Sequence, residues 1–93
     1  MNNQDKIVAT VAIFLKTESS DEYLYCLSGG KQRILAAIKN KLGWELESCF
    51  RITVEAHIPH GVEDYSDEAG RYRQFAKDVE KLISDEVDKI RNG

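Results

Sequence analysis

Two stretches of the chain have the composition and the alternation of β-strands. In residues 48–58 (SCFRITVEAHI) apolar positions alternate with polar ones from Phe50 onward, which predicts one face on a core and the other turned to water or to a partner. Residues 6–16 (KIVATVAIFLK) are apolar on both faces between the two lysines, apart from Thr10. A strand of this kind needs cover on both sides. We therefore expect it to be central in a sheet, with a partner subunit as one candidate cover for its second face.

The segment after the first strand has two interpretations. Residues 17–21 (TESSD) have the composition of a turn, and residues 22–27 (EYLYCL) then predict the second strand of a hairpin. The rival interpretation makes residues 19–27 (SSDEYLYCL) the first turns of a helix capped by Ser19 or Ser20. The pair Gly29-Gly30 would interrupt such a helix at a cost of about 1 kcal/mol for each glycine, so we favour the hairpin.

Residues 32–42 have the apolar spacing of an amphipathic helix. One stripe contains Ile34, Leu35, Ile38 and Leu42. Gly43 is a natural helix stop, because glycine tolerates the left-handed conformation that often ends helices. Ser28 is a candidate for the cap at the helix start, with Gly29 or Gly30 easing the entry.

The strongest periodic signal lies in residues 66–91, where apolar residues recur every three or four positions. Ser66 or Asp67 can cap this helix, and the early acidic residues suit its positive end. The helix would be about 39 Å long, whereas a compact chain of this size has a diameter of about 32 Å. We therefore expect the helix to outrun the body, so that its end either frays or meets another chain.

The predicted order of elements is β-β-α-β-α, which indicates the α+β class. The expected architecture is a small two-layer sandwich, in which two helices, the C-terminal one long, cover one face of a three-stranded sheet. Ninety-three residues suit a single domain, residues 1–93, with a loose N-terminus over residues 1–5. The sequence of a strand, a helix, a half-buried strand and a long C-terminal helix resembles that of small bacterial and phage regulators of RecA filaments. The resemblance concerns only the order of the elements. This chain differs from the family by the extra strand at residues 22–27, and we assign no functional residue from the resemblance.

The composition narrows the range of partners. Thirteen basic and 16 acidic residues give a net charge of −3, which implies no bulk attraction to nucleic acid or to an anionic membrane. The nine uncharged residues from Ile7 to Leu15 are too few to span a bilayer as a helix, and we recognise no signal peptide. We expect a cytoplasmic protein that does not associate with membranes.

Two cysteines are too few for a disulfide scaffold. We expect both as reduced thiols, with a single bridge between them left open. Cys26 lies in an apolar run and is expected in the core. Cys49 is in phase with the polar face of its strand and is expected to be exposed.

Residues 27–33 (LSGGKQR) resemble the signature loop of ABC-type ATPases, in which backbone amides at a helix start face a nucleotide phosphate. The phosphate-binding loop G-x-x-x-x-G-K-[ST] that holds the nucleotide in such enzymes is absent from the sequence, so we expect no ATP chemistry. A weaker hypothesis keeps this segment as a general anion site. Its residues would be Ser28, Gly29, Gly30, Lys31 and Arg33.

Glu55, His57 and His60 form the pattern E-x-H-x-x-H, and both residue types are legitimate zinc ligands. Three ligands from one short segment leave the coordination shell incomplete, so we interpret the histidines as surface residues beside the turn at Pro59. No catalytic, metal or cofactor site is therefore predicted. A small metal- or His-dependent enzyme around residues 55–60 remains the third of three hypotheses.

The second hypothesis is a nucleic-acid-binding accessory protein that uses the basic face of the helix at 31–41. That face contains Lys31, Arg33, Lys39 and Lys41, too few charges, without interleaved aromatic residues, for us to favour nucleic acid.

The first hypothesis is a non-enzymatic protein-interaction module, a small regulator, inhibitor or assembly factor that binds another protein or a second copy of itself. The candidate partner-binding residues lie on the polar face of strand 48–58, in the loop after it and on the last helix. They are Arg51, Thr53, Glu55, His57, Tyr65, Tyr72, Ile83, Val87 and Ile90.

Overall fold

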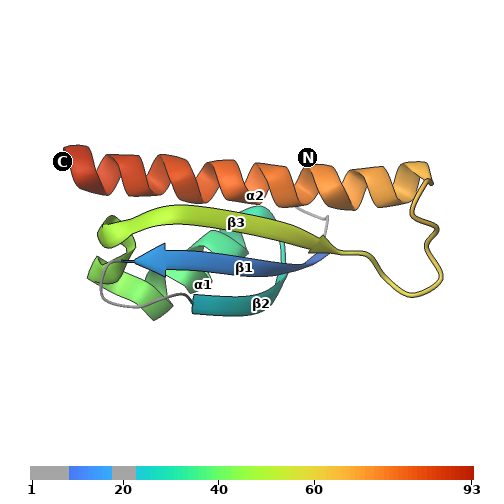
Figure 1. The fold of residues 1–93 in the computed structure, drawn as a ribbon, viewed down its shortest axis with the longest axis horizontal. Helices are drawn as coiled ribbons and strands as arrows, with labels where there is room; N and C mark the ends of the chain where they lie inside the picture. The colour runs from blue at the N-terminus through green and yellow to red at the C-terminus, as the bar shows by residue number, and fades with distance from the viewer. Residues whose placement is uncertain (1–8, 18–22) are drawn as a thin grey trace.

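The computed structural model describes residues 9–17 and 23–93, and it has the predicted order β-β-α-β-α (Figure 1). The predicted loose N-terminus at residues 1–5 lies outside the described residues. Three strands form one antiparallel sheet in the order β2-β1-β3. The elements are β1 (Ala9–Thr17), β2 (Tyr23–Gly29), α1 (Lys31–Leu42), the 3-10 helix η2 (Gly43–Ser48), β3 (Cys49–His57) and α2 (Asp67–Asn92).

One hydrophobic core holds the two layers together. Alternate residues of the central strand, from Ala9 to Leu15, are buried beneath the helices, because successive side chains of a strand point to opposite faces. The helices complete the core with their apolar stripes, including Ile34 and Ile38 of α1 and Val79 of α2. In Figure 1, α1 lies behind the sheet and α2 runs alongside β3. The predicted α+β sandwich, with two helices against one three-stranded sheet, is confirmed.

β2 settles the choice between hairpin and helix in favour of the hairpin. The strand pairs with β1 from Tyr23 to Gly29, two residues beyond the predicted end at Leu27. Gly29 has a φ of +134°, and a Cβ there would lie 3.1 Å from Cδ of Arg33, so both the backbone and the space favour glycine. Ser28 belongs to the strand, so its predicted role as a helix cap is wrong. Gly30 takes the cap position of α1 instead.

Both ends of α2 are tied to the rest of the chain. The hydroxyl of Ser66 accepts a hydrogen bond from the N–H of Ala69 and caps the helix as predicted. Near its other end, the guanidinium of Arg91 donates to the carbonyl oxygens of Glu47 and Cys49. The molecule measures 39 × 33 × 17 Å, and its longest dimension is about the length of the 26-residue α2 itself. Figure 1 shows that α2 extends past both ends of the sheet, so nothing contradicts the prediction that the helix outruns the body, and contact of its end with another chain stays a prediction.

A bulge at the start of β3 reverses two burial predictions. Lys16 pairs with Arg51 while Thr17 pairs with Cys49, so Phe50 is an extra residue on β3. As a result Cys49 points inward and is 1% exposed, whereas Phe50 is 59% exposed. The sequence predicted the opposite for both residues.

The position of Cys26 also differs from its prediction. It lies on β2 between Tyr25 and Leu27, which pack against the core, so its own side chain points away and is exposed. Both cysteines are free thiols. Burial raises the pKa of the Cys49 thiol, although the nearby Arg91 guanidinium acts in the opposite direction.

Candidate functional site

The face of the sheet opposite the helices, here called the open face, carries no other element among the described residues. It arises because α1 and α2 both pack against the alternate side chains that form the core. The other side chains of the three strands point away from the helices. They are Thr10, Ala12, Phe14 and Lys16 of β1, Leu24, Cys26 and Ser28 of β2, and Arg51, Thr53, Glu55 and His57 of β3.

The open face is apolar toward β2. Phe14 of β1 pairs with Leu24 of β2, and Ala12 pairs with Cys26, so four apolar side chains form a two-by-two block. Leu24 is 60% exposed, and Phe14 and Ala12 are half-buried. Large apolar side chains clustered on an uncovered face are typical of an interaction surface rather than of free solvent exposure.

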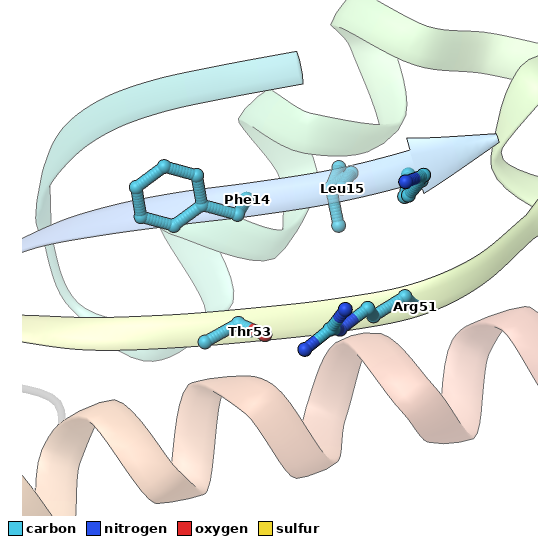
Figure 2. A pocket seen from close by; sticks show the side chains of 5 residues that line it. Phe14, Leu15, Arg51 and Thr53 are labelled. Atoms are coloured by element: carbon cyan, nitrogen blue, oxygen red, sulfur yellow. The ribbon is translucent and has the colours of Figure 1, made fainter. Parts of the chain in front are cut away.

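The same face is charged toward the start of β3. Lys16 and Arg51 are cross-strand partners and, with Phe14, Leu15 and Thr53, line a depression of about 260 Å³. Figure 2 shows Phe14 on β1 and Arg51 and Thr53 on the neighbouring strand β3. No carboxylate of the described residues forms an ion pair with either cation. The depression is smaller than the pockets that usually enclose small-molecule ligands, and its two cations beside an aromatic ring suit an acidic side chain of a partner.

The structure brings four of the predicted partner-binding residues together. Arg51, Thr53, Glu55 and His57 form the polar row of β3 on the open face, next to the apolar block. This row was found by its alternation in the sequence, and the apolar block was signalled only by the second apolar face of residues 6–16. Leu24 carried no separate signal, because a short apolar strand does not reveal which of its faces is buried.

The other predicted partner-binding residues are dispersed. Tyr65 is fully exposed in the loop before α2, and Tyr72 is half-buried at a hollow formed with His57 and Pro59. Ile90 is partly buried against the core. Ile83 and Val87 are 0% and 3% exposed, so their assignment to a partner surface is corrected: the chain's own core takes up that stripe of α2.

The five residues of the proposed anion site do not converge. Ser28 points to the open face, because β2 continues through it, whereas the Arg33 side chain lies against Gly29 on the helix side of the sheet. Lys31 forms an ion pair with Asp78 of α2 at 3.6 Å. The structure gives no support to a single anion site here.

The basic face of α1 is divided in a similar way. Lys39 forms an ion pair with Glu86 of α2 at 2.9 Å, and Lys31 pairs with Asp78. The hydrogen bond from Lys39 lowers the pKa of Glu86 below its usual range. Two of the four cations are thus engaged within the chain, which weakens the hypothesis of a continuous phosphate-binding face.

Glu55, His57 and His60 do not form a ligand cluster. Within residues 9–17 and 23–93, no three His, Cys, Asp or Glu side chains lie in an arrangement that could hold a metal ion. His57 is on the open face, and His60 is exposed in the turn that follows Pro59. The hypothesis of a metal-dependent enzyme gains nothing from this geometry.

No known protein family, no curated protein and no solved structure matches this chain. Of the helices in the described part of the chain, neither α1 nor α2 combines the length and the apolar character that a membrane span requires.

Proposed function

We propose that this chain is a non-enzymatic protein-interaction module that acts as a small regulator, inhibitor or assembly factor. The observation that supports the proposal is the open face, where the apolar block around Phe14 and Leu24 adjoins the polar row of β3. Leu24 is 60% exposed, so burying the rest of its side chain against a partner would contribute about 1–2 kcal/mol. The partner would cover the open face.

The charged residues beside the apolar block would allow the open face to distinguish between partner proteins. Arg51 lies at one end of the β3 row and Glu55 toward the other. A complementary partner therefore places an acidic side chain opposite Arg51 and a basic side chain opposite Glu55. Arrangements of this kind govern specificity and association rate more than total affinity. The open face would thus select its partner through β3 and gain binding energy through β1 and β2.

The area of the open face fits a transient complex. Nine residues of strand are about 30 Å long, and three strands are about 14 Å wide, which gives about 400 Å². A standard interface buries about 800 Å² on each partner. The open face alone therefore suits a reversible regulatory contact, and a tighter complex would also include adjoining surface such as the exposed Tyr65 loop.

Paired variants test the proposal. Partners captured by the immobilised chain from its source cells would be quantified for the wild type, Leu24→Asp and Arg51→Glu. As controls, Ala36→Asp and Arg71→Glu introduce the same acidic side chains at exposed positions of α1 and α2. We expect the open-face variants to reduce capture by about tenfold or more and the controls to match the wild type. Equal capture by all variants would contradict the proposal.

A second copy of the chain is one candidate partner. If a second copy covers the open face, sedimentation equilibrium at high micromolar concentration gives twice the chain mass for the wild type and the single mass for Leu24→Asp. A strict monomer would remove self-association and leave only other proteins as partners.

A further inference from the structure

The two edges of the sheet differ in how they are covered. At the β3 edge, the N–H of Val54 donates to Oε1 of Glu80 at 2.9 Å, so α2 satisfies a backbone group that faces away from β1. β2 forms the opposite edge, and Figure 1 shows no described strand or helix beyond it. Backbone groups on such an edge are a template for another strand. The part of the chain that the structure describes therefore offers one uncovered edge, β2.

The β2 edge lacks the features that usually prevent strand addition. From Tyr23 to Gly29 (YLYCLSG) it contains no charged residue and no proline. Its seven residues extend for about 23 Å. Leu24, Cys26 and Ser28 are exposed on the open face, so an added strand would also extend the apolar block sideways.

The remaining two cations of α1 flank this edge. After Gly29 the chain turns and α1 runs back along β2. The Arg33 side chain lies against Gly29, and Nζ of Lys41 lies 5.1 Å from the centre of the Tyr25 ring. Both cations are exposed, and among the described residues no carboxylate pairs with either of them.

The spacing of the two cations matches a strand. Arg33 and Lys41 are eight residues apart, which is about 12 Å along a helix. Gly29 and Tyr25, the residues they contact, are four apart, which is about 13 Å along a strand. Side chains on one face of an added strand repeat at about 6.7 Å. Residues four apart on that strand would therefore lie next to the two cations.

These observations favour an acidic peptide over a second copy. Antiparallel pairing of two β2 strands needs a two-fold axis perpendicular to the sheet, and this axis places both α1 helices on the same face. The α1 cations of one copy, Arg33 and Lys41, would then lie on the same side as those of the other copy and approach them, and like charges across an interface are unfavourable. An acidic strand instead gains the backbone hydrogen bonds and complementary charges.

We propose that the outer edge of β2 binds an extended acidic segment of a partner protein as a fourth strand, with acidic side chains four residues apart beside Arg33 and Lys41. This mode of recognition combines main-chain hydrogen bonds with side-chain selectivity. The inference rests on the proposed function, because it specifies the kind of segment that the partner contributes.

Titration of the full-length isotope-labelled chain with short capped peptides tests this inference by nuclear magnetic resonance. The peptide TEVTVET places its glutamates four apart on one face. TKVTVKT reverses their charge, and TEVTEVT places them on opposite faces. We expect TEVTVET to shift the amides of residues 23–29, to protect the alternate amides of this strand that face away from β1, and to bind about tenfold more tightly than either control.

Charge-reversed variants complete the test. The double variant Arg33→Glu, Lys41→Glu should bind TEVTVET about tenfold more weakly and prefer TKVTVKT. The control double variant Arg71→Glu, Lys77→Glu changes the net charge by the same amount, but on the exposed side of α2. It should bind TEVTVET like the wild type. Three results would overturn the inference. They are chemical shift changes confined to other elements, no binding at millimolar peptide, and an unchanged affinity of the double variant for TEVTVET. β2 amides already protected in a dimer without peptide would overturn it as well. Failure here with intact capture through Leu24 and Arg51 would leave the proposed function standing, whereas loss of both would remove it.

Discussion

The hydrogen bond from the Val54 N–H to the Glu80 carboxylate covers the β3 edge, and its contribution to stability can be measured. Glu80 is half-buried on α2, and its carboxylate accepts the N–H of Val54 at 2.9 Å. A hydrogen bond to a charged group contributes about 1.5–3 kcal/mol, and an unsatisfied buried N–H costs about 1–3 kcal/mol. Because water can reach part of this site, we expect Glu80→Ala to lower the free energy of unfolding by about 2 kcal/mol.

The corresponding decrease in the melting temperature is about 8–16 °C for a domain of this size. Glu80→Gln keeps an acceptor oxygen without the charge and should cost about half as much. Asp88→Ala removes an exposed acid from the same helix and should change stability by no more than about 0.5 kcal/mol.

Amide exchange gives a local readout of the same bond. In the wild type the Val54 amide should exchange slowly although it faces away from β1, and Glu80→Ala should accelerate its exchange by up to about thirtyfold. Calorimetry would supply the melting temperatures and nuclear magnetic resonance the exchange rates. If Glu80→Ala were as stable as the wild type and the exchange of Val54 were unchanged, α2 would not close this edge, and the contrast between the two sheet edges would be lost.

Three further predictions concern the bulge, the cysteines and the helix cap. Phe50→Ser should lower the free energy of unfolding by no more than about 1 kcal/mol in a urea titration, because the bulge leaves Phe50 59% exposed; a loss above about 2 kcal/mol would contradict the register. In the native state a thiol reagent should modify Cys26 quickly and Cys49 only on unfolding, and equal rates would contradict their placement. Because the folded state raises the pKa of Cys49, its contribution to stability should decline as pH rises above the ordinary thiol value of 9.0, and Cys49→Ala should remove that part of the pH dependence. Ser66→Ala should cost about 1 kcal/mol and Ser66→Asp almost nothing, as measured by thermal unfolding; equal losses would exclude a capping role.

The periodicity of the sequence was sufficient to predict the elements and their order. Apolar residues three and four apart identified α1 and α2, and Gly43 marked the end of α1 as expected. The double apolar character of β1 indicated both its central position and the uncovered second face. These features depend on local spacing, which a single sequence contains.

The features that were missed depend on contacts between distant segments. A one-residue shift at the start of β3 exchanges the burial of Cys49 and Phe50, and since both residues are apolar the sequence fits either register. The 3-10 helix Gly43–Ser48 inserts Leu46 into the core without any periodic signal. The division of the α1 cations between α2 and the β2 edge depends on how α1 is rotated on the sheet, which the spacing of its charges does not determine.

Hydrogen–deuterium exchange of the chain, free and in complex with its captured partner, locates the surface on which the partner docks. If the partner docks on the open face and the adjoining β2 edge, the amides of β2 exchange more slowly in the complex than in the free chain, while those along the exposed side of α2 keep their rates. Slower exchange along α2 alone, with the exchange of β2 unchanged, would place the partner on α2 and exclude docking on the open face.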